Sequence, residues 1–166
     1  MSTTKKINNI KILLQVWNLE NDDWDNTLDI YKCGFSTSKS WIDDEKNQGL
    51  AFCIVKGKRE FYGFNKFSNY EQLPTTKKTI HILWQKFYVQ NVSNYGGGNY
   101  KYYYVSGEKR ATIFKEKPIV LDTITNFVTF ERKYMRTGMT NIANDETGVT
   151  KELLRLSDEL KFYPGF

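Results

Sequence analysis

Histidine, cysteine and proline are scarce in this chain of 166 residues. There is one histidine, His81, and the two cysteines, Cys33 and Cys53, lack the close CxxC spacing of metal sites. Two cysteines are too few for a disulfide framework, which predicts a reducing compartment. The sequence contains no P-loop, dinucleotide fingerprint, kinase signature, nucleophile elbow or HExxH zinc motif. These absences argue against the enzyme classes that such motifs mark, and we expect neither a metal nor a cofactor.

Long hydrophobic runs are missing as well. The apolar stretch IKILLQVW, residues 10–17, is far too short to span a bilayer, and the preceding MSTTKKINN lacks the apolar region of a secretory signal. The sequence therefore predicts a protein without a signal peptide or transmembrane segment. We expect it to be cytoplasmic or otherwise intracellular and to have no membrane partner.

Aromatic residues are abundant, and they make up 16% of the chain, with eleven tyrosines and eleven phenylalanines. Such residues fit the pleated, half-buried surface of a sheet. We predict a mainly β (α+β) fold in one domain, residues 1–166: a single antiparallel sheet, barrel or sandwich with a short C-terminal helix within 146–161. Thr150 is the expected N-cap of that helix, in which Leu153, Leu156 and Leu160 would share a face.

Several segments fit short strands separated by turns. INNIKILLQVWNL fits both a helical stripe and strand alternation, and we favour the strand. LAFCIVKGKREFYGF suggests a hairpin around Gly57, and TIHILWQKFYVQNV is the strongest strand candidate. A second hairpin would use SNYGGGN as its connection and YKYYYVS as its return strand. ATIFK, PIVLD and NFVTFERKY would continue the meander.

The return strand of the second hairpin carries tyrosine rings on both faces. Tyr100, Tyr102 and Tyr104 alternate with Lys101, Tyr103 and Val105, and the last two form the better core pair. Exposed rings beside positive charge are typical of proteins that stack single-stranded bases, whereas buried rings would be ordinary core. The candidate nucleic-acid-binding residues are Tyr100, Tyr102, Tyr104, Lys101, Lys109, Arg110, Lys115 and Lys117.

Positive charge is concentrated in the middle of the chain. Residues 56–117 hold twelve basic and four acidic side chains, an excess of eight, whereas the whole chain has a net charge of +5. A local excess of this kind is typical of a polyanion site, although a solvated lysine-rich surface gives the same composition. Nineteen lysines against five arginines predict little sequence readout, because arginine is the residue that reads guanine edges.

A short segment near the C-terminal third resembles the metal-binding core of PD-(D/E)XK nucleases. In KPIVLDTITNFVTFERKYMR, Asp122 is followed by Glu131 and Lys133, two residues apart as on one face of a strand. The resemblance implies that both carboxylates hold Mg²⁺ while the lysine assists the attacking water. The proline lies four positions before the aspartate here, instead of one, and ordinary sheets often carry such a surface pair.

Three functions follow from these patterns. The first is a non-catalytic β module that binds nucleic acid, preferably single-stranded, with little sequence specificity. The second is a structural or assembly subunit of the viral or phage capsid type, with self-assembly, and the third is the metal-dependent nuclease. His81, which lies between apolar neighbours, has no serine or cysteine partner near it in the sequence, and we expect a satisfied or half-buried strand histidine.

Overall fold

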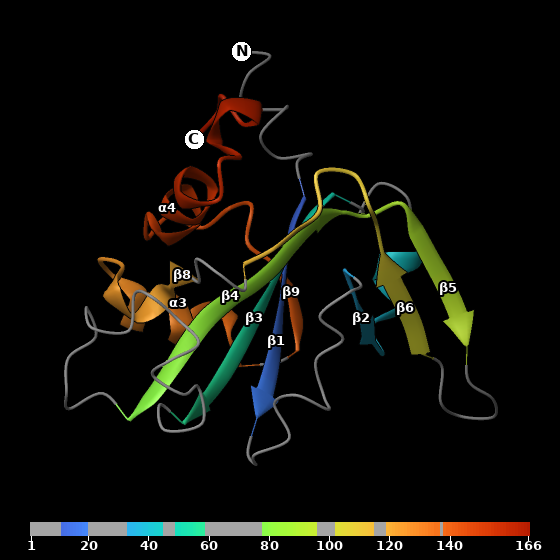
Figure 1. Ribbon diagram of the computed structural model, residues 1–166, viewed down its shortest axis with the longest axis horizontal. Coiled ribbons are helices and arrows are strands. Elements are labelled where there is room, and N and C mark those ends of the chain that lie inside the picture. The colour runs from blue at the N-terminus through green and yellow to red at the C-terminus, as the bar shows by residue number, and fades with distance from the viewer. Residues whose placement is uncertain are drawn as a thin grey trace.

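The computed structural model describes residues 11–19, 33–44, 49–58, 78–95, 102–114, 119–136 and 138–166. This part of the chain is mainly β, with two open sheets and a short C-terminal helix, which confirms the predicted fold class (Figure 1). Among these residues, no helix is both long and apolar enough to cross a membrane. The strands are β1 (Ile12–Leu19), β2 (Gly34–Thr37), β3 (Leu50–Lys58), β4 (Thr79–Tyr88), β5 (Asn91–Tyr95), β6 (Tyr102–Ser106), β7 (Thr112–Ile113), β8 (Ile119–Val120) and β9 (Met139–Asn141). The α-helices are α3 (Phe127–Tyr134) and α4 (Val149–Leu156), and three short 3-10 helices are η1 (Ser40–Asp43), η5 (Leu121–Thr123) and η6 (Leu160–Phe162).

The larger sheet has the strand order β7-β4-β3-β1-β9, and β8 pairs with β4 next to β7. Its pairs are antiparallel except for β1 and β3, which run parallel along their whole length. The parallel pair departs from the expected antiparallel sheet. It arises because the chain passes from β1 through β2 of the other sheet before it enters β3, and a crossover of this kind returns the chain in its original direction.

The two central strands are buried on both faces. Ile12 and Leu14 of β1 pack towards the helices, whereas Leu13 between them packs towards the smaller sheet. A strand covered on both sides needs apolar residues at successive positions, and such a run fits no single periodicity. This explains why INNIKILLQVWNL matched helical and strand patterns equally, although the preferred strand is confirmed.

A β-bulge in β4 changes which side chains reach the helices. The register with β3 shifts between Cys53 and Ile54, which pair with Gln85 and Leu83, so the bulge leaves one extra residue in β4 between them. Leu83 therefore packs against the helices, whereas Gln85 accepts a hydrogen bond from Gly34 of the smaller sheet. Polar side chains on both sides of the bulge, at positions 81, 86 and 88, consequently all contact the helical layer.

The smaller sheet, β2-β6-β5, is antiparallel and packs on the face of the larger sheet opposite the helices (Figure 1). Phe35, Tyr103 and Val105 from this sheet join Cys53 and Phe87 of the larger one in a single buried cluster. The predicted return strand is confirmed as β6, but the strand predicted over 79–92 is divided between β4 of the larger sheet and β5 of the smaller one. Residues 93–95 of the predicted SNYGGGN connection belong to β5, which pairs with β6, and the rest of that connection lies outside the described residues. The described part of the chain thus forms three layers: helices, larger sheet and smaller sheet.

Further local predictions were wrong. The strand β3 runs straight through Gly57, which pairs with Ile80 of β4, instead of turning there. Residues 127–134, predicted as a strand, form the helix α3, because Phe127 and Phe130 then share a buried face. Thr150 lies inside α4 instead of capping it.

The first turn of α4 obtains its hydrogen bonds from a residue outside the helix. The Asp145 carboxylate accepts hydrogen bonds from the backbone N–H and the hydroxyl of Thr150, at 3.0 and 2.9 Å, while Gly148 takes the N-cap position with a φ of 90°. Glycine adopts this left-handed conformation without the steric cost of a side chain. The predicted common face is also incomplete, since Leu153 is buried but Leu156 is 39% exposed and Leu160 belongs to η6.

Candidate nucleic-acid interface

Two tyrosines lie exposed on the outer face of the smaller sheet. Burial alternates along β6: Tyr103 and Val105 face the larger sheet, whereas Tyr102 and Tyr104 remain 40% and 37% exposed. Strand alternation alone had predicted this division, and the structure confirms it for these four residues. The other predicted members of the face, at positions 100, 101, 115 and 117, lie outside the described residues.

The strands on either side of the two rings are polar but carry no formal charge. Ser36 of β2 and Ser93 of β5 lie on either side of Tyr104 in the strand register. Gly34 and Asn91 lie in the same way on either side of Ser106. Tyrosine is the only ionisable residue type in β2, β5 and β6. These strands therefore offer rings, hydroxyls and amides to a ligand instead of formal charge.

Tyr104 lies against the backbone of the neighbouring strand. A Cβ atom built on Gly34 would lie 2.7 Å from the Tyr104 hydroxyl oxygen, which is too close for any real side chain. Glycine at this position therefore allows the Tyr104 ring to lie across β2. A flat ring fixed in this way can take part in stacking without first losing rotational freedom.

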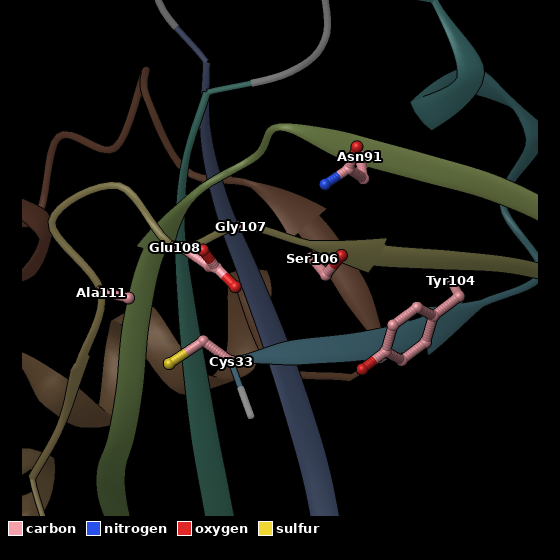
Figure 2. Close-up of a pocket in the computed structure, with 7 residues that line it drawn as sticks. All are labelled: Cys33, Asn91, Tyr104, Ser106, Gly107, Glu108 and Ala111. Carbon is pink, nitrogen blue, oxygen red and sulfur yellow. The ribbon is translucent and has the colours of Figure 1, made fainter. Parts of the chain in front are cut away.

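A cavity of about 310 Å³ opens beside Tyr104. Its lining combines residues from the smaller sheet with the loop that follows β6, and Figure 2 shows the side chains of Cys33, Asn91, Tyr104 and Glu108 around the hollow. Burial raises the pKa of the Cys33 thiol, so this cysteine is less reactive than a free one. The lining residues are Cys33, Asn91, Tyr104, Ser106, Gly107, Glu108 and Ala111.

The loop after β6 is held in place by its backbone. Gly107 passes so close to the Tyr88 carbonyl that an added Cβ would overlap it. The Gln90 side-chain oxygen accepts hydrogen bonds from the N–H groups of Glu108 and Lys109, at 2.6 and 3.2 Å. Both of these residues are exposed, so a fixed backbone presents one carboxylate and one ammonium next to the cavity.

Comparisons of the chain with known protein families, curated proteins and solved structures found no match. The functional interpretation of the candidate site therefore depends on the geometry of its own residues.

Arg110, a member of the predicted set, lies on the helical side of the larger sheet. Its guanidinium is 3.7 Å from the ring centroids of both Tyr88 and Phe162, and it lies 3.5 Å from the Glu159 carboxylate. A cation held between two rings and a carboxylate ties the C-terminal segment to the sheet. Among the described residues of the predicted set, Tyr102, Tyr104 and Lys109 lie on or next to the smaller sheet, and Arg110 does not join them.

Glu159 neutralises a second cation of the basic block. The Lys86 ammonium lies 2.9 Å from the Glu159 carboxylate and donates a further hydrogen bond to the Ser157 carbonyl at 2.5 Å. Lys86 is 7% exposed and Glu159 is 1% exposed. Among the described basic residues of 56–117, Arg110 and Lys86 are thus engaged within the fold, which makes the positive excess at the surface smaller than the sequence suggests.

The residues of the nuclease resemblance do not share a strand. Glu131 and Lys133 both lie on α3, where a separation of two residues points side chains in different directions. Lys133 is exposed and lies 5.4 Å from the Tyr134 ring centroid. Among the described residues, no group of three or more His, Cys, Asp or Glu side chains is arranged to hold a metal ion.

Instead, the two carboxylates of that resemblance meet at His81. The Asp122 carboxylate accepts a hydrogen bond from the His81 backbone N–H at 2.6 Å and lies 3.1 Å from Nδ1, while Glu131 lies 3.0 Å from Nε2. His81 lies in β4, which confirms the predicted strand histidine, and at 2% exposed it is fully buried instead of half-buried. Sequence reasoning missed these partners because they lie 41 and 50 residues away in elements whose packing the sequence does not display.

Proposed function

We propose that this chain is a non-catalytic module that binds single-stranded nucleic acid by stacking bases on Tyr102 and Tyr104. The observation that carries the proposal is the pair of exposed rings at alternate positions on the outer face of one strand. Alternate residues of a strand are about 6.6–6.8 Å apart, which leaves room for one base on each ring. Aromatic side chains on an open sheet are a recurring platform for unpaired bases.

The polar neighbours of the rings suit base edges better than phosphates. Ser93 and Asn91 provide hydroxyl and amide groups that can donate and accept hydrogen bonds. Lys109 is exposed on the adjoining loop and supplies positive charge for a phosphate. We therefore attribute most of the affinity to stacking, with a smaller electrostatic contribution that added salt weakens.

The experiment is fluorescence anisotropy with a short labelled single-stranded oligonucleotide. Replacing Tyr102 or Tyr104 by alanine removes one stacking surface, and each stacked base contributes about 1–3 kcal/mol, so we expect each change to weaken binding by roughly 5- to 150-fold. Phenylalanine at either position should retain most of the affinity, because the ring remains.

Val128→Ala is the matched control for these variants. Val128 is 54% exposed on α3, in the layer on the other side of the larger sheet. Its replacement removes exposed apolar surface without touching the tyrosines, and we expect unchanged binding. Wild-type affinity in the double variant Tyr102→Ala, Tyr104→Ala would refute the proposal, and so would an equal loss in the control.

A further inference from the structure

We infer that the cavity beside Tyr104 accepts one unpaired base of the bound strand and favours guanine. This inference rests on the proposed function, and it adds a base preference that stacking alone does not give. Tyr102, Tyr104 and Ser106 occupy successive positions on the outer face of β6. Rings fill the first two positions, whereas the third has a small side chain and opens into the cavity.

The third position carries only the small side chain of Ser106, so no ring covers the strand there. Asn91 and Ala111 line the cavity together with Ser106 at this end of β6. A strand that stacks one base on each tyrosine would therefore bring its next base to a recess instead of a ring. The cavity volume of about 310 Å³ is within the range of small-molecule pockets, which begins near 300 Å³.

The polar groups at the cavity discriminate between bases. A carboxylate group such as that of Glu108 accepts hydrogen bonds and does not donate them. Guanine presents two adjacent donors, N1–H and the N2 amino group, which match the two carboxylate oxygens. Uracil and thymine present one donor between two carbonyl oxygens, which the carboxylate repels, whereas adenine and cytosine each offer one amino group. The expected order is guanine first, adenine and cytosine next, and uracil or thymine last.

Two features make Glu108 suitable for this role. The Gln90 side chain fixes the backbone N–H groups of Glu108 and Lys109, so the carboxylate extends from a loop that is already positioned. Asn91, across the hollow in Figure 2, carries an amide that can accept from one base edge and donate to another. A preorganised acceptor costs less free energy to engage than one on a free loop.

The test compares oligouridine strands that carry a single central guanosine, adenosine or cytidine with the all-uridine strand. A bidentate contact to a base typically discriminates by about 1–3 kcal/mol, so we expect wild-type protein to bind the guanosine strand roughly 5- to 150-fold more tightly than oligouridine. Glu108→Gln should abolish most of this ratio while binding to oligouridine stays within a few-fold. Glu146→Gln, which changes an exposed carboxylate between β9 and α4, should preserve the ratio.

A second variant tests the cavity itself. Ala111 is an exposed lining residue, and Ala111→Phe places a ring in the space without changing the core. It should lower the guanosine preference and leave oligouridine binding intact. Equal affinity for all four strands, or an unchanged ratio in Glu108→Gln, overturns the inference and leaves the stacking proposal standing. If no strand binds, or if binding ignores Tyr102 and Tyr104, both proposals fail.

Discussion

Tyr88 and Tyr163 share a partly buried polar cluster in which neither phenol ionises easily. The Tyr88 hydroxyl donates to Glu159 at 3.0 Å and lies 3.2 Å from the Tyr163 hydroxyl. Burial raises the pKa of Tyr88 far above its ordinary value of 10.0, and the neighbouring Tyr163 and Glu159 raise it further. Burial likewise raises the pKa of Tyr163. Both residues thus favour the folded state only while the phenols stay protonated.

The free energy of unfolding should therefore depend on pH in the alkaline range. Unfolded tyrosine loses its proton near the ordinary value of 10.0, whereas folded Tyr88 keeps it, so the stabilisation is complete below that pH and is lost as the pH rises above it. We expect the free energy of unfolding to fall above about pH 10 by up to ~1.4 kcal/mol per pH unit for each such phenol. Tyr88→Phe should lose about 1 kcal/mol at neutral pH and show a shallower alkaline decline.

Urea denaturation of wild type and Tyr88→Phe, in buffers on either side of the ordinary tyrosine pKa of 10.0, measures both quantities. Tyr102→Phe is the control, since Tyr102 is 40% exposed on the outer face of β6 and lies outside this cluster. Parallel alkaline slopes for wild type and Tyr88→Phe would contradict the assignment.

For single residues, the sequence predicts exposure that follows from alternation along a strand. It does not predict contacts with residues that are distant in the chain. Tyr102 and Tyr104 could be placed on the exposed face because their own strand determines it. Arg110 could not be placed, because Phe162 and Glu159, which hold it, are about fifty residues further along the chain. A basic residue in a tyrosine-rich segment fits a phosphate contact or a buried cluster equally well.

The helix α3 illustrates the same limit for a whole element. NFVTFERKY alternates well enough for a strand, yet the helix places Phe127 and Phe130 in the core and leaves Val128 exposed. The Phe127 ring also packs on His81, with ring centroids 5.0 Å apart. Packing against β4 thus selects the helix, and a pattern of nine residues does not contain that information.

Contacts on one side of α3 should therefore decide its stability. Glu131 faces His81, whereas Lys133 is exposed. We expect Glu131→Ala to destabilise the fold by about 1–3 kcal/mol, because it leaves a buried imidazole nitrogen without its polar neighbour. Lys133→Ala is the matched control on the same helix and should have little effect. Thermal unfolding followed by circular dichroism compares the two, and equal losses would show that His81 does not anchor the helix.

The whole molecule depends on the contact between its two sheets. The composition and the short strands predicted a mainly β chain, but they did not predict that β5 and β6 would leave the larger sheet and cover it. Nor could they predict the parallel pairing of β1 and β3, since register between distant strands leaves no local pattern. The sequence therefore predicts that the chain is rich in strands, whereas the arrangement of those strands in two layers results from tertiary packing.

The reactivity of the Cys53 thiol can show whether the two sheets separate. Its side chain is completely buried between them, and burial raises the pKa of its thiol well above the ordinary value. In a Cys33→Ser variant, we expect a thiol reagent to label Cys53 at a rate that rises with urea in parallel with the loss of circular dichroism. Cys33, which is only half-buried, should react faster in the converse Cys53→Ser variant. Rapid labelling of Cys53 without urea would mean that the smaller sheet detaches locally.

The pairing of β1 with β9 has a consequence for the order of events during biosynthesis. Leu13 pairs with Asn141, and the Asn141 side chain also accepts a hydrogen bond from the Ile12 N–H. A ribosome must therefore translate most of the message before this edge of β1 can be covered. Until then the nascent polypeptide carries an unpaired apolar strand, a situation in which chaperone binding and a slow translation rate have the most influence on yield.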